Sequence, residues 1–149
     1  MDVLGKDGYK VIKNFISQDQ CEFLQHYCKI RHQLNFEQFD AVTDYDTGIY
    51  SSYGMESLML QKQKDVEEHT GLKLFPTYSF WRMYTNESTL GIHTDRPSCE
   101  YSATIMLGSD GTPWEFVAGD KPYIQKPGDA IIYRGCDIPH GRKNKLEII

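Results

Sequence analysis

The chain is organised around one stretch, Leu90-Gly91-Ile92-His93-Thr94-Asp95-Arg96. Successive side chains of a β-strand point to opposite faces, so His93 and Asp95, two residues apart, are expected to project from the same face. A further histidine, His140, lies in a later stretch that a distant strand can bring to this pair. The sequence therefore predicts a metal centre made of His93, Asp95 and His140.

Strand-like segments surround each of the three predicted ligands. Residues 78–84 form an aromatic, β-prone run before the His-x-Asp, and residues 101–107 form a second such run after it. Residues 127–133 read as a turn that leads into a buried strand ahead of His140. All three ligands are therefore expected on or beside strands. Two histidines and one carboxylate with open positions opposite them are typical of non-haem Fe(II) oxygenases.

The N-terminal half is predicted to hold one strand and two helices. Residues 9–12 read as a strand, and Ser17 with Gln20 forms a capping box that begins a helix to about residue 32. The apolar residues of this helix recur at spacings of three and four, which predicts one broad buried face. The members of that face are Cys21, Phe23, Leu24, Tyr27, Cys28 and Ile30.

Turn formers dominate residues 35–54, which are predicted to form a long loop. A second helix is expected from Met55 to a stop at Gly71. Its apolar face is predicted to consist of Met55, Leu58, Met59 and Val66.

The C-terminal half has a periodicity of two and frequent turn signals. The signals stand at residues 86–88, 109–113, 118–122, 126–129 and 135–137. Many short strands at this spacing suggest a sandwich or a barrel, including jelly-roll forms. The predicted architecture is α+β and mainly β, with two N-terminal helices packed outside a barrel-like core into which the ligands point.

Composition bounds the class of protein. A length of 149 residues with 40% hydrophobic and 25% charged residues predicts one globular domain over 1–149. The net charge of -5 argues against a nucleic-acid surface. The basic cluster of Arg142, Lys143 and Lys145 is interpreted as a solvated terminus.

No signal-peptide pattern and no membrane-length apolar run is visible, so the expected location is cytoplasmic and no membrane partner is expected. The cysteines show no zinc or disulfide pattern, which suits reduced thiols, and Cys21 and Cys28 are predicted to be core residues. The sequence does not fix the oligomeric state.

Three motifs carry a family resemblance. They are the Gly-Tyr-Lys-Val-Ile-Lys-Asn-Phe-Ile-Ser run at 8–17, Arg82-Met83-Tyr84 before the His-x-Asp, and the Gly-Asp-Ala-Ile-Ile-Tyr-Arg-Gly run at 128–135. With these motifs the chain from Gly8 to Arg142 resembles the prolyl-4-hydroxylase-like branch of the 2-oxoglutarate and Fe(II)-dependent dioxygenases.

This resemblance implies a double-stranded β-helix core of the jelly-roll, cupin-like kind. It implies Fe(II) as the metal, 2-oxoglutarate and dioxygen as cosubstrates, and ascorbate as a candidate reductant. The implied reaction is hydroxylation of a peptidyl proline or a small molecule, with release of succinate and CO2.

The far carboxylate of 2-oxoglutarate needs a cationic or hydroxyl anchor. In the resembled family this anchor is usually an arginine or lysine on the last strand, at a position that here falls at or beyond Ile149. Either that strand is missing from the sequence or another group takes the role. Arg142 should share the face of His140 by strand parity. Tyr84 corresponds to a tyrosine that contacts the cosubstrate in the resembled prolyl hydroxylases, and Arg82 shares its strand face.

Two other functions remain open from the sequence. One is a non-catalytic jelly-roll module that keeps the metal ligands but has lost cosubstrate turnover. The other is a hydrolytic zinc enzyme, because two histidines and a carboxylate also bind Zn(II) with a position left for water. Against zinc hydrolysis, no His-Glu-x-x-His motif is present.

Overall fold

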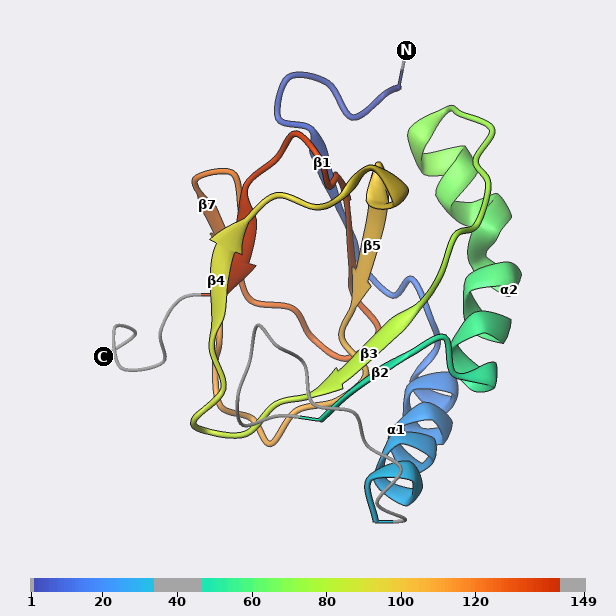
Figure 1. Ribbon diagram of the computed structural model, residues 1–149, viewed down its shortest axis with the longest axis vertical. Coiled ribbons are helices and arrows are strands. Elements are labelled where there is room, and N and C mark those ends of the chain that lie inside the picture. The colour runs from blue at the N-terminus through green and yellow to red at the C-terminus, as the bar shows by residue number, and fades with distance from the viewer. Residues whose placement is uncertain (1, 34–46, 143–149) are drawn as a thin grey trace. The chain divides into compact units, whose positions relative to one another are not determined.

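The computed structural model describes residues 2–33 and 47–142 (Figure 1). The chain divides into two units, each described here by itself. Unit 1 comprises Met1–Val3 and Leu24–Ser88, and unit 2 comprises Leu4–Phe23 and Thr89–Ile149. Organisation as a single domain over 1–149 stays a prediction. Neither described helix is long and apolar enough to cross a membrane.

Helix α1, Gln18–Gln33, begins as predicted. The Gln20 amide donates to the Ser17 hydroxyl at 3.1 Å, so Ser17 is the N-cap residue. Cys21, Leu24 and Cys28 are buried, which confirms the two cysteines as core residues and the centre of the predicted face. Burial raises the pKa of the Cys28 thiol to about 12, as expected for a thiol without access to water.

The predicted breadth of this helical face is wrong. The side chains of Phe23 and Ile30 are 71% and 55% exposed. With about 100° between successive residues, both lie roughly opposite the stripe of buried residues. Spacings of three and four alone did not separate these two sides of the helix.

Unit 1 contains strands β2 (Thr47–Tyr50) and β3 (Phe80–Met83), which pair antiparallel. The predicted loop over residues 35–54 is therefore wrong from Thr47 onward, while residues 35–46 lie outside the described part of the chain. Pairing with β3 explains the difference, because it places Ile49 opposite Trp81 and buries both side chains. This local sequence is polar, but the cross-strand pair stabilises it as a strand.

Helix α2 also lies in unit 1 and spans Tyr53–Thr70. Gly71 adopts a left-handed conformation with φ 75°, and its amide donates to the Glu67 carbonyl at 2.8 Å. The predicted glycine stop is confirmed, since glycine takes this conformation without strain. Met55 and Leu58 of the predicted face are buried.

Unit 2 contains the remaining strands, which are short and antiparallel. They are β1 (Tyr9–Ile12), β4 (Leu90–His93), β5 (Tyr101–Ile105), β6 (Phe116–Ala118), β7 (Lys121–Tyr123), β8 (Ala130–Arg134) and β9 (His140–Arg142), with a 3-10 helix η1 at Pro97–Cys99. They form two sheets with strand orders β1-β8-β5 and β4-β9-β6-β7. The predicted turn signals separate these strands from one another, so the prediction of short strands in the C-terminal half is confirmed.

The core of unit 2 gathers around β6 and β8. Phe116, Ala118, Ile131 and Tyr133 form a buried cluster against which side chains of β1 and β7 pack. Residues 130–133 are buried on both faces of β8, which pairs with β1 on one side and β5 on the other. Central strands of this kind read as continuous apolar runs, and residues 130–133 fit that description.

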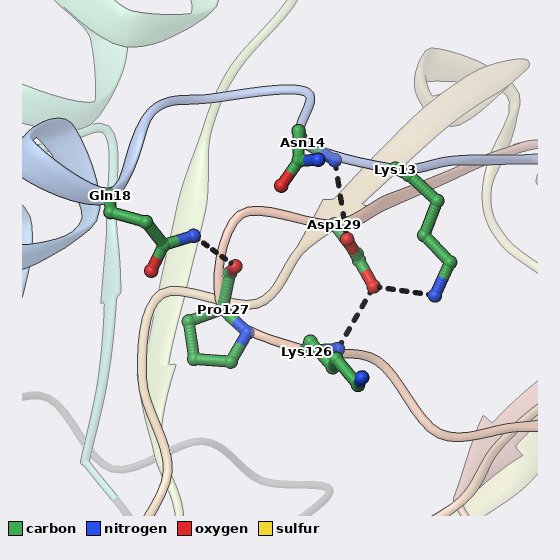
Figure 2. Close-up of a pocket in the computed structure, with 6 residues that line it drawn as sticks. All are labelled: Lys13, Asn14, Gln18, Lys126, Pro127 and Asp129. Atoms are coloured by element: carbon green, nitrogen blue, oxygen red, sulfur yellow. Dashed lines mark hydrogen bonds and ion pairs between the residues drawn. The ribbon is translucent and has the colours of Figure 1, made fainter.

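A buried carboxylate ties two connections of unit 2 together at the start of β8 (Figure 2). It lies in a depression of about 490 Å³ lined by Lys13, Asn14, Gln18, Lys126, Pro127 and Asp129. Asp129 accepts hydrogen bonds from the Lys126 amide at 3.0 Å and the Asn14 amide at 3.2 Å. The Lys13 ammonium approaches the same carboxylate at 3.3 Å. The connection from β1 to α1 is thereby joined to the turn before β8.

The same turn requires glycine at position 128. Gly128 has φ +95°, and a Cβ there would lie 2.8 Å from the Ile16 carbonyl oxygen. The Gly128 carbonyl accepts from the Ile16 amide at 3.2 Å, and the Gln18 side chain donates to the Pro127 carbonyl at 2.8 Å. The backbone before helix α1 and the backbone of the turn before β8 therefore lie in close contact, in addition to the contacts of the Asp129 carboxylate.

Asp129→Asn is expected to destabilise the protein by about 1–3 kcal/mol at pH 7, because charged hydrogen bonds are replaced by neutral ones. Burial raises the pKa of the Asp129 carboxyl, but the hydrogen bonds from Lys126, Asn14 and Lys13 outweigh burial and hold the pKa below its usual range. A lowered native pKa stabilises the fold above the unfolded pKa of about 3.9, and this stability is lost as pH falls through the native pKa.

Urea unfolding between pH 3 and 7 checks this prediction. The difference between wild type and Asp129→Asn should shrink as the pH falls toward 3. Asp120→Asn, at an exposed position in the β6–β7 turn, serves as the matched control and should follow wild type. A difference that stays constant over the whole pH range would contradict the role of the Asp129 charge.

Candidate metal centre

The three predicted ligands converge in unit 2. Asp95 Oδ1 lies 3.1 Å from His140 Nε2 and 3.4 Å from His93 Nε2. One ligand atom from each residue falls within 4.8 Å of the others, and the two imidazole centroids are 4.5 Å apart. Two nitrogen donors and one oxygen donor therefore face a common point.

Strand pairing accounts for the approach of the two histidines. His93 ends β4 and His140 begins β9, and the antiparallel register places these residues directly opposite each other. Directly opposed residues on one face have neighbouring side chains. The pairing is irregular between Leu90 and His93, so the strand is distorted where it delivers its ligand.

Asp95 reaches the site in a different way from the one predicted. β4 ends at His93, so the two residues do not share the face of a regular strand and that part of the prediction is wrong. The Asp95 amide instead donates to the carbonyl of Gly135, in the turn between β8 and β9, at 2.7 Å. A contact distant in sequence therefore replaces the strand geometry.

Backbone carbonyls orient both imidazole rings. His93 Nδ1 lies 2.7 Å from the Gly91 carbonyl oxygen, and His140 Nδ1 lies 2.7 Å from the Ile138 carbonyl oxygen. A carbonyl oxygen only accepts, so with a metal ion at Nε2 the Nδ1 of each ring would carry the proton and donate it to its carbonyl, and Nε2 would offer its lone pair to the metal. Such carbonyl contacts are the usual outer partners of metal-binding histidines.

The site is closed on one side and open on the other. The His140 side chain is 3% exposed, and its ring lies 4.5 Å from that of Tyr133 and 6.2 Å from that of Phe116. The side chains of Asp95 and His93 are 18% and 39% exposed. A ligand can therefore approach the donor atoms from the side of His93.

Arg142, the first of the predicted cosubstrate residues, lies on the same short strand as His140 and is buried. The interpretation of the basic cluster as a solvated terminus is therefore wrong for Arg142, while Lys143 and Lys145 lie outside the described residues. Its guanidinium lies over the rings of Trp114 and Phe116, at 5.1 Å and 5.5 Å, and donates to the Trp114 carbonyl at 3.0 Å. Phe116 also faces His140, so the arginine and the histidine both face one ring.

Arg82 and Tyr84, the other two predicted cosubstrate residues, lie in unit 1 at and just beyond the end of β3. The Arg82 guanidinium donates to the Tyr84 hydroxyl at 3.2 Å and lies 4.9 Å from the centroid of the Phe80 ring. The two residues are thus held together. Their role in cosubstrate binding stays a prediction.

Two contacts at the site were not predicted from the sequence. The Ser102 hydroxyl approaches Asp95 Oδ2 at 3.4 Å, and Gly135 lies directly against the same carboxylate. Gly135 carried a turn signal between two predicted strands, but that signal says nothing about a neighbour 40 residues earlier. Ser102 sat inside a β-prone run with no feature of its own.

The fold has a counterpart among solved structures, and the site places a His-x-Asp pair beside a distant histidine on that fold. The chain is similar to the crystal structure of a prolyl-4-hydroxylase from Pseudomonas putida, with a TM-score of 0.70 and 15% sequence identity over 93% of this chain and 86% of that chain. The predicted resemblance is thereby confirmed for the fold. No protein-family model matches the sequence, and no curated protein sequence is similar to it.

Proposed function

We propose that this protein is a non-haem Fe(II) and 2-oxoglutarate-dependent dioxygenase. The observation that carries the proposal is the convergence of two oriented Nε2 atoms and one carboxylate oxygen on a fold of the prolyl-4-hydroxylase type. The proposal includes the double-stranded β-helix connectivity of the core and a single domain over the chain.

The residues fit an iron ion. His93, Asp95 and His140 would hold it, because imidazole and carboxylate together suit Fe(II) and the exposed side of the site leaves positions for further ligands. The metal, when bound, supplies the redox chemistry that couples dioxygen and 2-oxoglutarate to hydroxylation, with succinate and CO2 as products. The protein supplies the ligands, their orientation and the binding of the organic molecules.

Arg142 is proposed to bind the far carboxylate of 2-oxoglutarate. It stands two residues after His140 on β9, a separation of roughly 7 Å along a strand, which is close to the length of a five-carbon diacid. A guanidinium can bind a carboxylate through two parallel hydrogen bonds. Tyr84, with Arg82 bonded to its hydroxyl, is proposed as a second contact to the cosubstrate.

Arg142→Ala is expected to weaken 2-oxoglutarate binding by about 10–100-fold while metal binding is retained, because charge-assisted hydrogen bonds contribute about 1.5–3 kcal/mol. Calorimetric titration of the metal-loaded variant with 2-oxoglutarate measures the change. Lys10→Ala removes the same charge from an exposed position on β1 and should bind as wild type does. Unchanged 2-oxoglutarate affinity in Arg142→Ala would remove this residue from the proposal.

The proposed substrate is a peptidyl proline or a small molecule that enters from the exposed side of His93. The similar structure is described as a prolyl-4-hydroxylase, which supports the first of these. A cytoplasmic setting and the lack of a nucleic-acid partner are part of the proposal, the latter resting on the net charge of -5.

Anaerobic titration of the Fe(II)-loaded protein with 2-oxoglutarate tests the function. A visible charge-transfer band should appear as the cosubstrate chelates the metal, and succinate should form once oxygen and a substrate are added. Iron binding without the band would instead favour the non-catalytic metal-binding module. Tight binding of zinc with hydrolytic turnover would favour the zinc enzyme.

A further inference from the structure

The position of the Asp95 carboxylate depends on its neighbours rather than on strand pairing. Asp95 lies beyond the end of β4, and its amide is held by the Gly135 carbonyl at 2.7 Å. Its Oδ1 faces both histidines, and its Oδ2 faces the opposite way toward Ser102 and Gly135. Any group that moves Oδ2 therefore also turns Oδ1 away from the metal position.

Gly135 leaves no room for a side chain. A Cβ at this position would lie 2.5 Å from Asp95 Oδ2 and 3.1 Å from Ser102 Oγ, and it would also meet the Cys99 carbonyl. The φ of Gly135 is not in the left-handed region, so an alanine would meet no conformational barrier there. Glycine is required at this position because the Cys99 carbonyl and the Asp95 carboxylate together fill the adjacent space.

Ser102 holds the same oxygen from the neighbouring strand. It lies on β5 opposite Tyr133 of β8, and its hydroxyl is directed at Asp95 Oδ2 at 3.4 Å. This distance is long for a hydrogen bond between oxygens, so the hydroxyl contributes less to the carboxylate position than the space at Gly135 does.

We propose that Gly135 and Ser102 are positioning residues of the metal centre, Gly135 by leaving space for the Asp95 carboxylate and Ser102 by donating to its Oδ2. The inference rests on the proposed function, because it assumes that His93, Asp95 and His140 bind a divalent metal. Neither residue touches the metal. Both act on it through Asp95.

Cobalt(II), a redox-stable substitute for Fe(II), is the probe. Calorimetric titration gives its affinity, and the visible absorption of bound Co(II) reports the ligand geometry. Partners of metal ligands typically change metal affinity by 10–100-fold, so Gly135→Ala is expected near about 100-fold and Ser102→Ala near about 10-fold. Both variants should also change the Co(II) spectrum, which a general loss of stability would not do.

Ser102→Thr keeps the hydroxyl and suits a strand, so it should restore the affinity lost in Ser102→Ala. Two control variants make the same substitutions, glycine to alanine and serine to alanine, away from the metal ligands. Gly54→Ala adds a methyl group against the Tyr27 ring, and Ser57→Ala removes a hydroxyl bonded to the Tyr53 carbonyl in helix α2. Both controls should bind Co(II) with wild-type affinity and spectrum.

The outcomes separate this inference from the proposed function. If the wild-type protein binds no Co(II), the metal centre itself is wrong. If the wild type binds and Ser102→Ala matches it in affinity and spectrum, the role of Ser102 is overturned. If Gly135→Ala folds and binds as wild type does, the role of Gly135 is overturned. Should Gly135→Ala fail to fold, Gly135 is required by the fold itself and its role as a positioning residue is overturned, while Ser102→Ala and Ser102→Thr still decide the role of Ser102.

Discussion

Asp95→Ala is expected to abolish metal binding while leaving the protein folded. The carboxylate is the one negatively charged group of the ligand set, and its Oδ1 is the atom that both Nε2 atoms face. Loss of an outer partner alone costs up to about 100-fold in affinity, so loss of the ligand should exceed that. Removal should not unfold the chain, because the side chain is 18% exposed and lies outside a strand.

Thermal unfolding with and without Co(II) measures this effect. A ligand that binds only the native state raises the unfolding temperature, so wild type should shift with Co(II) and Asp95→Ala should not. Asp137→Ala is the matched control. It removes an exposed carboxylate two residues after Gly135, and this carboxylate lies 3.7 Å from the Arg134 guanidinium. If Co(II) raised the unfolding temperature of Asp95→Ala as much as that of wild type, Asp95 would not be a metal ligand.

Phe116→Ala is expected to lower the free energy of unfolding by about 3–5 kcal/mol, the usual cost of removing a buried phenylalanine. The Phe116 side chain is 2% exposed, and its ring lies 5.8 Å from Tyr133 and 6.2 Å from His140. The cavity left by the substitution would open beside the buried ligand. Metal affinity should therefore fall together with stability.

Urea unfolding of the metal-free protein measures the change in the free energy of unfolding. Phe116→Leu retains most of the apolar volume and should cost much less than Phe116→Ala. Phe23→Ala provides the surface comparison, since a side chain 71% exposed should change stability by no more than about 0.5 kcal/mol. A loss below about 1 kcal/mol in Phe116→Ala would show that this ring is not central to the core of unit 2.

Local patterns in the sequence were enough to predict the helix ends, the turns and the three converging residues. The Ser17 cap and the Gly71 stop depend on hydrogen bonds within a few residues, and the structure contains both. His93 and His140 could be brought together because each was expected on or beside a strand-like run. In these cases the sequence signal and the physical cause lie in the same short segment.

Contacts between distant segments were not visible in the sequence. The polar strand β2 forms because Ile49 meets Trp81, 32 residues later, and no local pattern shows that partner. Asp95 is held by Gly135, whose importance comes from space rather than from its own conformation. The exposed side of α1 was misassigned for a related reason, since only tertiary packing decides which apolar side chains of a helix are covered.

The two ends of β8 determine where the chain can change in length. Hydrogen bonds hold Asp129 just before the strand and Gly135 just after it, and residues 130–133 between them are buried on both faces. An extra residue between these positions would shift the strand relative to the hydrogen bonds at one of its ends. Ile131 and Tyr133 would then turn out of the core. The turn at residues 109–113 is exposed and held by its own short-range hydrogen bonds, so homologous chains are expected to vary in length there and to keep residues 129–135 free of insertions and deletions.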